Sequence, residues 1–270
     1  MIRCLVALVC TCWLCLVGIN DLALAEVSTP QFSEQQLRQG EKIAQKAIKA
    51  IEKGNLDLAE SYWTELVEQF PQNPAVWSNR GNVRVSQHKI DQAIADFDQS
   101  IAIAPQYPDA YLNRGIAYEG QQEWDLALAD YNQALDINPQ DPVAYNNRGN
   151  ALAGQQEWDL ALADYEQAIE IAPNFSLARA NAALVTYQIG NQSEAIFQLR
   201  NLVRKYPMFP DVRAAMTAVL WSIGNQGEAE SNWVAAMGLD SRYQNIDWVT
   251  NVRRWPPKMI EALEQFLNLS

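Results

Sequence analysis

The chain has 270 residues, and 32 acidic residues against 20 Lys and Arg residues give it a formal net charge of −12. This balance argues against DNA, RNA or anionic lipid as the main partner, because binding to all three depends on basic side chains. The content of 49% hydrophobic residues, with only 12 Gly and 12 Pro, excludes a disordered, collagen-like or low-complexity chain.

Residues 1–25 have the pattern of a secretory signal peptide. Arg3 precedes an apolar run over residues 4–19, and Ala23 and Ala25 form a small-residue cleavage site. We expect cleavage after Ala25 and export to a periplasm or a thylakoid lumen. Because the run is shorter than the roughly 20 residues of a membrane-spanning helix, an uncleaved signal anchor that tethers the protein is the alternative.

All four cysteines lie inside this segment, at Cys4, Cys10, Cys12 and Cys15. A mature chain of residues 26–270 would therefore have no disulfide, no thiolate nucleophile and no zinc site with cysteine ligands. Residues 26–39 form a lead-in, in which Ser33 and Gln36 have the spacing of a capping box. This pair predicts a helix that begins there and continues into the next segment.

A period of 34 residues organises the rest of the chain. The segment Gly120–Tyr131 recurs unchanged as Gly154–Tyr165. Extending the period in both directions gives six gapless blocks, at 40–73, 74–107, 108–141, 142–175, 176–209 and 210–243. Repeats of this length are typical of stacked helix pairs.

Two positions in the blocks, each numbered from 1, hold small residues. Position 20 is alanine throughout: Ala59, Ala93, Ala127, Ala161, Ala195 and Ala229. Position 8 is glycine in the central blocks: Gly81, Gly115 and Gly149. We expect a structural role for both, at the closest approach of two antiparallel helices in each block.

Two further positions indicate where the second helix of each block begins and ends. Position 18 has a residue that favours helix N-caps in five blocks: Asp57, Asp91, Asp125, Asp159 and Ser193. Position 32 is proline in five blocks: Pro71, Pro105, Pro139, Pro173 and Pro207. Proline stops a helix because it has no N–H to donate.

The whole pattern resembles the tetratricopeptide repeat (TPR) family. The residues that carry the resemblance are Tyr111, Gly115, Ala127, Tyr131, Ala134 and Pro139, and again Tyr145, Gly149, Ala161, Tyr165, Ala168 and Pro173. The resemblance covers residues 40–243 and implies an all-α fold, a right-handed α-solenoid of six helix pairs. The outer blocks depart from the family pattern, with Ile43 and Lys46 in the first and Arg179 and Arg213 in the last two.

The resemblance also implies a concave groove lined by positions 2, 5, 6, 9, 12 and 13. Asparagines recur at three of these positions: Asn79, Asn82, Asn113, Asn146, Asn147, Asn150 and Asn181. Apolar candidates in the groove are Leu112, Ile116, Leu184 and Tyr187. Similar asparagine ladders in other TPR superhelices hold extended polypeptides, so the resemblance implies the same role here. An amide suits it, because it both donates and accepts hydrogen bonds. The alternative is that the recurring Asn-Arg-Gly run is a feature of helix design without a ligand role.

The groove positions contain no Lys or Arg. An uncharged or basic extended segment is therefore the favoured partner, and clamping of an acidic chaperone tail is disfavoured. Arginines occupy position 7 instead, at Arg80, Arg114 and Arg148, and aspartates occupy position 23. We expect structural ion pairs between neighbouring helices, for example Asp96 with Arg114 and Asp130 with Arg148; ligand contact by the arginines is the alternative.

Nothing in the sequence favours catalysis. His88, the only histidine, falls at a turn position, and one histidine cannot build a metal site. The chain shows no phosphate-binding glycine loop and no nucleophile elbow. We expect no enzyme activity, no cofactor and no metal.

Residues 244–270 form a C-terminal capping segment. Met259, Ile260, Leu263, Phe266 and Leu267 fall at helical spacing, which predicts a helix that closes the solenoid. The preceding run 253–257 resembles the C-terminal region of exported TPR proteins of cyanobacteria and chloroplast lumens. A separate docking patch is the alternative for this tail.

These patterns predict a protein-protein interaction scaffold that binds an extended polypeptide segment in its concave groove. We expect a role in the assembly or maintenance of an envelope or thylakoid protein complex. The competing hypothesis is a structural spacer or oligomerisation subunit, bound through its convex face or its C-terminal tail. The sequence leaves the partner and the oligomeric state open.

Overall fold

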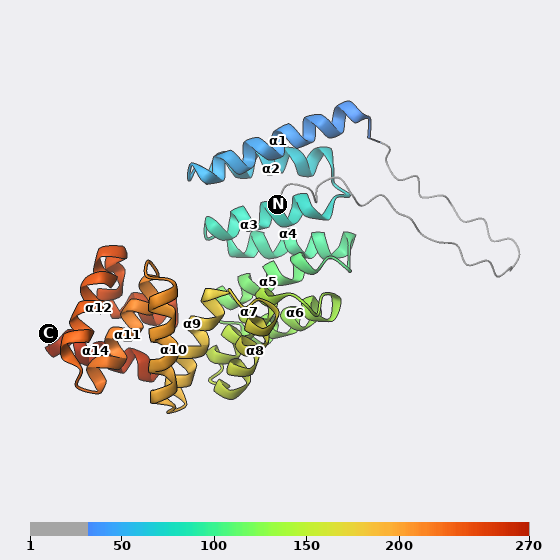
Figure 1. Ribbon diagram of the computed structural model, residues 1–270. Coiled ribbons are helices and arrows are strands. Elements are labelled where there is room, and N and C mark those ends of the chain that lie inside the picture. The colour runs from blue at the N-terminus through green and yellow to red at the C-terminus, as the bar shows by residue number, and fades with distance from the viewer. Residues whose placement is uncertain (1–31, 270) are drawn as a thin grey trace, which may run out of the picture. The chain divides into compact units, whose positions relative to one another are not determined.

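The computed structural model describes residues 32–269, so the predicted signal peptide lies outside the described residues. The described part consists of helices joined by short turns, coloured in chain order in Figure 1. The first helices of the six repeats are α1 (Glu34–Glu52), α3 (Pro74–Ser86), α5 (Pro108–Gly120), α7 (Pro142–Gly154), α9 (Ser176–Gln188) and α11 (Pro210–Ser222). The second helices are α2 (Leu56–Gln69), α4 (Ile90–Ile103), α6 (Trp124–Ile137), α8 (Trp158–Ile171), α10 (Gln192–Lys205) and α12 (Gln226–Leu239).

The segment after α12 is less regular. It contains a 3-10 turn (Ser241–Gln244), the short α13 (Ile246–Trp248), a π-helical turn (Val249–Arg253) and the terminal α14 (Pro257–Leu269). Among residues 32–269, no helix has the length and apolar character that crossing a membrane requires.

The chain divides into two units, and the boundary in the sequence lies between Arg38 and Gln39. In the first unit, the predicted capping box is confirmed. The Gln36 N–H donates to Ser33 Oγ at 3.2 Å, and the Ser33 N–H donates to Gln36 Oε1 at 2.9 Å. These reciprocal bonds satisfy two N–H groups at the start of α1, which begins at Glu34.

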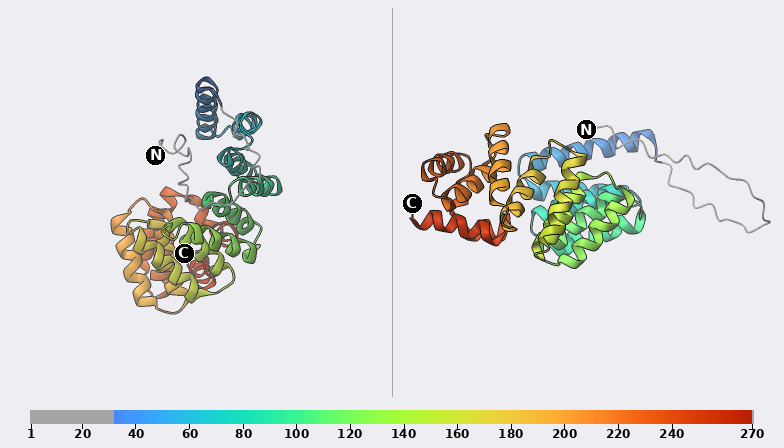
Figure 2. Two further views of the ribbon diagram at one scale, coloured as in Figure 1. Left: turned by 90° about the vertical axis from the view of Figure 1, so that its right-hand side faces the viewer. Right: turned by 60° about the horizontal axis from the view of Figure 1, so that its bottom comes forward.

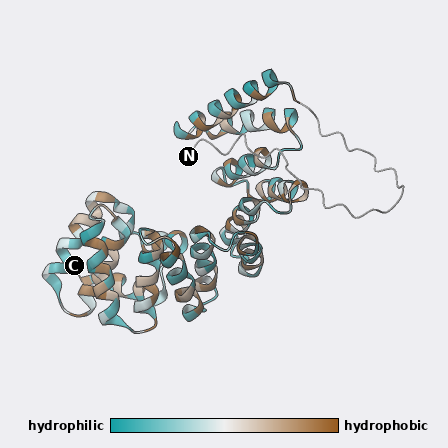
Figure 3. Ribbon diagram, turned by 45° about the vertical axis from the view of Figure 1, so that its right-hand side comes forward, coloured by the Kyte–Doolittle hydropathy of each residue, from teal (hydrophilic) through white to brown (hydrophobic). Residues whose placement is uncertain are grey.

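In the second unit, helices pack in consecutive order. From α3 to α12, each first helix packs on its own second helix, and each second helix packs on the first helix of the next repeat. Hydrophobic and hydrophilic residues alternate along these helices (Figure 3), as a helix buried on one side requires. The predicted all-α solenoid of helix pairs is confirmed, whereas the 34-residue block boundaries stay a prediction.

Small residues allow each helix pair to close. The six alanines at position 20 are all fully buried. A Cβ atom added to Gly81 would lie 2.5 Å from the Phe97 ring, and one added to Gly115 would lie 2.6 Å from the Tyr131 ring. The glycines at position 8 therefore make room mainly for the aromatic ring at position 24 of the same repeat.

The prediction that position 18 caps the second helix is wrong. Each second helix starts at position 17, so that Asp91, for example, lies in the first turn of α4 and Lys89 precedes it. The reason is the turn at position 15, which is left-handed in every repeat and reverses the chain early: Gly54, His88, Gln122, Gln156, Gly190 and Gly224. The aspartates instead accept bonds from the next repeat, with Gln87 Nε2 2.8 Å from Asp57 Oδ1 and Gln155 Nε2 2.6 Å from Asp125 Oδ1.

The arginines at position 7 form ion pairs, but with other partners than those expected. Arg80 binds both oxygens of Asp96, at 2.6 and 3.0 Å, inside its own repeat. Arg114 pairs in the same way with Asp130, and Arg148 with Asp164. The expected pairs of Asp96 with Arg114 and of Asp130 with Arg148 are wrong, because positions 7 and 23 face each other across one helix pair.

These ion pairs also connect adjacent repeats. Arg114 donates to Asp98 of the preceding repeat at 2.5 Å, and Arg148 donates to Asn132 at 2.8 Å. The hydrogen bonds to the Asp130 carboxylate raise the pKa of the Arg114 guanidinium. Arg114 and Arg148 therefore each fix both the pairing of their own two helices and the register of that pair on the repeat before.

The C-terminal helix closes the end of the solenoid, as predicted. α14 packs on α11 and α9 (Figure 2), and it buries Met259, Leu263 and Phe266. The Phe266 ring meets Trp221 and Trp233 edge-on, at centroid distances of 5.2 and 5.1 Å. This apolar contact covers the face of the last repeat that would otherwise be open to solvent.

Replacing Gly115 by Ala should lower the free energy of unfolding by about 1–3 kcal/mol, the range typical of an overpacked core. The Tyr131 ring that the new methyl group would meet is fully buried and cannot move aside. Urea denaturation measures the change. The matched control is Gly120→Ala in the same helix, where a Cβ meets nothing within 4 Å. Equal stability of the two variants would show that position 8 is not a close contact.

Candidate functional site

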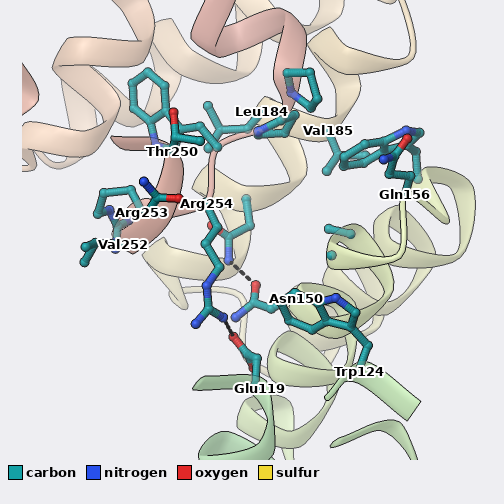
Figure 4. A pocket seen from close by; sticks show the side chains of 18 of the residues that line it. Glu119, Trp124, Asn150, Gln156, Leu184, Val185, Thr250, Val252, Arg253 and Arg254 are labelled. Atoms are coloured by element: carbon teal, nitrogen blue, oxygen red, sulfur yellow. Dashed lines mark hydrogen bonds and ion pairs between the residues drawn. The ribbon is translucent and has the colours of Figure 1, made fainter. Parts of the chain in front are cut away.

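A cavity of about 500 Å³ lies against the helices of the third, fourth and fifth repeats. Its walls come from α5, α6, α7, α8 and α9 on one side and from residues 250–257 of the C-terminal segment on the other (Figure 4). The C-terminal segment therefore does more than cap the last repeat, because part of it faces the predicted groove.

One buried carboxylate anchors this segment. Asp211 is only 2% exposed, and it accepts hydrogen bonds from the Tyr243 hydroxyl at 2.7 Å and from the Trp255 indole at 3.0 Å. The Arg253 guanidinium also donates to Asp211. On the other flank, the Lys258 N–H donates to Gln188 Oε1 at 2.9 Å. Residues 253–258 are thus held at both ends.

Arg254 lies between these anchors and reaches across the cavity. Its φ of 53° is left-handed, which is uncommon for a residue with a Cβ. Its Nη1 lies 2.7 Å from Oε1 of Glu119, as Figure 4 shows, and its guanidinium carbon lies 5.4 Å from the centre of the Trp124 ring. The guanidinium therefore combines a charge-assisted hydrogen bond with a cation-π contact.

Glu119 sits at position 12 of the third repeat, at the end of α5. Its side chain is 14% exposed, and its second oxygen accepts a hydrogen bond from the Tyr131 hydroxyl at 2.8 Å. Burial raises the pKa of the Glu119 carboxyl above its ordinary value, although the Tyr131 hydroxyl and Arg254 counteract part of this rise. A cation at this point thus offsets the cost of holding a carboxylate away from water.

Three of the predicted groove residues line the cavity: Asn150, Asn181 and Leu184. The Asn181 amide nitrogen donates to Asn146 Oδ1 at 3.0 Å and to Asn150 Oδ1 at 3.1 Å, in the repeat before. The Tyr165 hydroxyl also donates to Asn150, at 3.0 Å. These amides connect the fourth repeat to the fifth as well as facing the cavity.

The other predicted groove residues lie outside the cavity, on the first helices α3, α5, α7 and α9. Asn146 is almost fully buried and donates to Asn147, while Asn113 donates to Ser78 Oγ of the second repeat at 3.1 Å. Leu112 packs into the core beside Tyr131, and the Tyr187 hydroxyl donates to Ser222. Asn82 and Ile116 are exposed, and Asn79 is half-buried. A binding role for this set stays a prediction.

Sequence reasoning did not single out Glu119, Trp124 or Arg254. A signal for Glu119 was available, because position 12 is acidic in the third repeat alone: it reads Ile51, Val85, Glu119, Ala153, Tyr187 and Trp221. Nothing in the repeat pattern could pair Glu119 with a residue 135 positions later. His88, in contrast, is exposed in a left-handed turn, as its turn position indicates.

Replacing Asp211 by Ala should release the C-terminal segment, because Arg253, Tyr243 and Trp255 would lose their shared acceptor. Removing one member of a buried charged pair typically costs about 3–5 kcal/mol. Limited trypsin digestion, read by mass spectrometry, should show faster cleavage after residues 253 and 254. Asp247→Ala, an exposed change in the same segment, is the control. Unchanged cleavage in Asp211→Ala would show that other contacts hold the segment.

Comparison with protein families gives two matching models, both described as tetratricopeptide repeat. One matches residues 142–175, and the other matches residues 45–108 and 78–142. No curated protein matches the chain.

Solved structures with the same fold include TTC0263, a thermophilic TPR protein of Thermus thermophilus. It is 20% identical over 67% of this chain and 99% of its own, with a TM-score of 0.58. YrrB, a TPR protein with an unusual peptide-binding site, is 19% identical over 66% of this chain and 92% of its own, with a TM-score of 0.52. MamA is 23% identical over 59% of this chain and 93% of its own, with a TM-score of 0.52. Residues 45–175 therefore match the tetratricopeptide repeat in sequence, and the chain shares the all-α solenoid fold of these solved TPR structures.

Proposed function

We propose that the protein is an interaction scaffold that binds an extended polypeptide segment along the first helices of its third to fifth repeats. One observation carries this proposal. Residues 250–257, which include irregular backbone between the π-helical turn and α14, already lie against that face. The face therefore accommodates a polypeptide main chain, with one of its side chains reaching into the cavity.

The chemistry of the face supports polypeptide as the ligand. Asn150 and Asn181 supply amides, while Leu184, Trp124 and Trp158 supply apolar surface in the same cavity. Amides can bind a peptide backbone whatever its side chains are, and apolar walls add area. YrrB, which shares the fold, is itself described as a peptide-binding TPR protein.

The charges favour an uncharged or basic segment. Glu119 is the only acidic side chain among the described residues that line the cavity, and the basic ones there, Arg253 and Arg254, come from the C-terminal segment itself. The chain as a whole carries a net charge of −12. Long-range repulsion would slow the approach of an acidic segment.

We further propose that the protein is exported and acts in the assembly or maintenance of an envelope or thylakoid protein complex. The signal-peptide pattern of residues 1–25 supports export. N-terminal sequencing of the protein from its own cells should give a chain that starts at Glu26. A chain that retains residues 1–25 in the membrane fraction would favour a signal anchor instead.

The amides can be tested with the double variant Asn113→Ala, Asn147→Ala. Both side chains lie at position 6, on two of the repeats that border the cavity, and both are only half-buried. Losing two hydrogen bonds to a peptide, at about 1 kcal/mol each, should weaken binding about tenfold or more. The measurement is a titration of labelled extended peptides, first selected from an array of segments without acidic residues.

The matched control is Gln133→Ala, Gln167→Ala, which removes two amides from the second helices of the same two repeats. Thermal melting checks that both double variants fold. Equal peptide affinity of the groove variant and the control would remove these asparagines from the mechanism. If the wild-type protein binds no segment on the array, polypeptide capture itself is contradicted. Complex formation that needs only the tail would then favour the spacer hypothesis.

A further inference from the structure

We propose that Glu119, Tyr131 and Trp124 form an arginine socket, which takes one arginine side chain of an extended partner segment. The chain's own Arg254 fills this socket when the partner is absent. This inference rests on the proposed function. It adds that an arginine of the partner is recognised, and that Arg254 competes with that arginine for the same socket.

The socket meets a guanidinium in two ways. The Glu119 carboxylate accepts from Arg254 Nη1 at 2.7 Å, and the Trp124 ring lies 5.4 Å from the guanidinium carbon. The Tyr131 hydroxyl holds the other carboxylate oxygen at 2.8 Å, and Tyr131 is itself fully buried. The Tyr131 hydroxyl therefore holds the Glu119 carboxylate in a fixed orientation, whether or not a cation is bound.

This chemistry favours arginine over other side chains. A guanidinium is planar, so it can stack on an indole ring while an N–H points at a carboxylate in its own plane. A lysine ammonium is a point charge and is more strongly hydrated, which makes the same position less favourable for it. The amides of Asn150 and Asn181 in the same cavity are suited to the main chain on either side of the arginine.

Arg254 differs from the structural arginines of the repeats. Arg80, Arg114 and Arg148 each bind both oxygens of an aspartate inside their own repeat. Arg254 reaches one oxygen of a residue in a distant repeat, and its side chain remains 34% exposed. A contact of this kind can open without disturbing a helix pair.

The backbone around Arg254 allows such an opening. The residue takes a left-handed φ directly after a π-helical turn, and both features are unfavourable for an ordinary residue unless neighbouring contacts hold them. Those contacts belong to the neighbours: Arg253 and Trp255 bind Asp211, and the Lys258 N–H binds Gln188. The Arg254 side chain can therefore leave the socket while the segment stays anchored.

The test uses the full chain and two blocked peptides. The first is Ser-Ala-Arg-Trp-Pro-Pro-Ser, and the second has citrulline, which is neutral and of the same shape, in place of arginine. Binding is measured by calorimetry for the wild type, Arg254→Gln and Glu119→Gln. The matched control is Arg242→Gln, because Arg242 also pairs with a carboxylate, Asp240 at 2.8 Å, and also lies over a tryptophan ring, Trp248 at 4.6 Å.

Arg254→Gln should bind the arginine peptide at least about fivefold more tightly than the wild type and Arg242→Gln do. A factor of about five is the lower end of the coupling typical between two binding events. The citrulline peptide should bind the wild type and Arg254→Gln equally. Glu119→Gln keeps an acceptor for the Tyr131 hydroxyl but removes the charge, so it should bind the two peptides alike.

Three results would overturn the socket. The first is equal binding of both peptides to Arg254→Gln, which would leave polypeptide capture in place. The second is loss of folding in Arg254→Gln, which would make Arg254 a structural residue. The third is a wild-type dimer, seen by light scattering, that Arg254→Gln dissociates, since a second copy would then fill the socket. Failure of the peptide array, in contrast, would contradict the proposed function itself.

Discussion

The contact between a glycine on the first helix and an aromatic ring on the second is the constraint on which the central repeats depend. Gly115 lies against Tyr131, and Gly149 lies against Tyr165. The same two rings carry hydroxyls that donate to Glu119 and Asn150 at the cavity wall. Core packing therefore determines where the polar groups of the site lie, because a ring displaced by a larger residue would move its hydroxyl as well.

Polar contacts between repeats add a second level of order. Arg114 and Arg148 bind both their own repeat and the one before, and Asn181 binds two amides of the preceding repeat. Bonds of this kind repeat along the stack, so each helix pair is aligned by its neighbour. An asparagine that binds a neighbouring repeat has fewer hydrogen-bonding groups left for a ligand. Asn181, for example, already donates to two amides of the preceding repeat.

The 34-residue period was sufficient to predict the helix pairs, the buried alanines and the proline stops, because these features depend on residues inside one repeat. It was insufficient for the start of each second helix, where the left-handed turn at His88 or Gln122 overrides the capping preference of Asp91 or Asp125. To predict that Arg80 pairs with Asp96, one must know which sides of the two helices face each other, and residue spacing alone does not define this. The contact of Arg254 with Glu119 lies outside any periodic pattern, because only the folded chain brings a non-repeated tail beside the third repeat.

The twelve residues from Gly120 to Tyr131 are identical to those from Gly154 to Tyr165, so the turns of two successive repeats bring the same side chains to the cavity: Gln122 and Trp124 from one, Gln156 and Trp158 from the next. A ligand that contacted only these turn residues could shift by one repeat and find equivalent contacts. Glu119 breaks this equivalence, because the residue at the same position of the next repeat is Ala153. Together with Ile116, which stands where the next repeat has Asn150, this carboxylate would set the register of a polypeptide bound along these repeats.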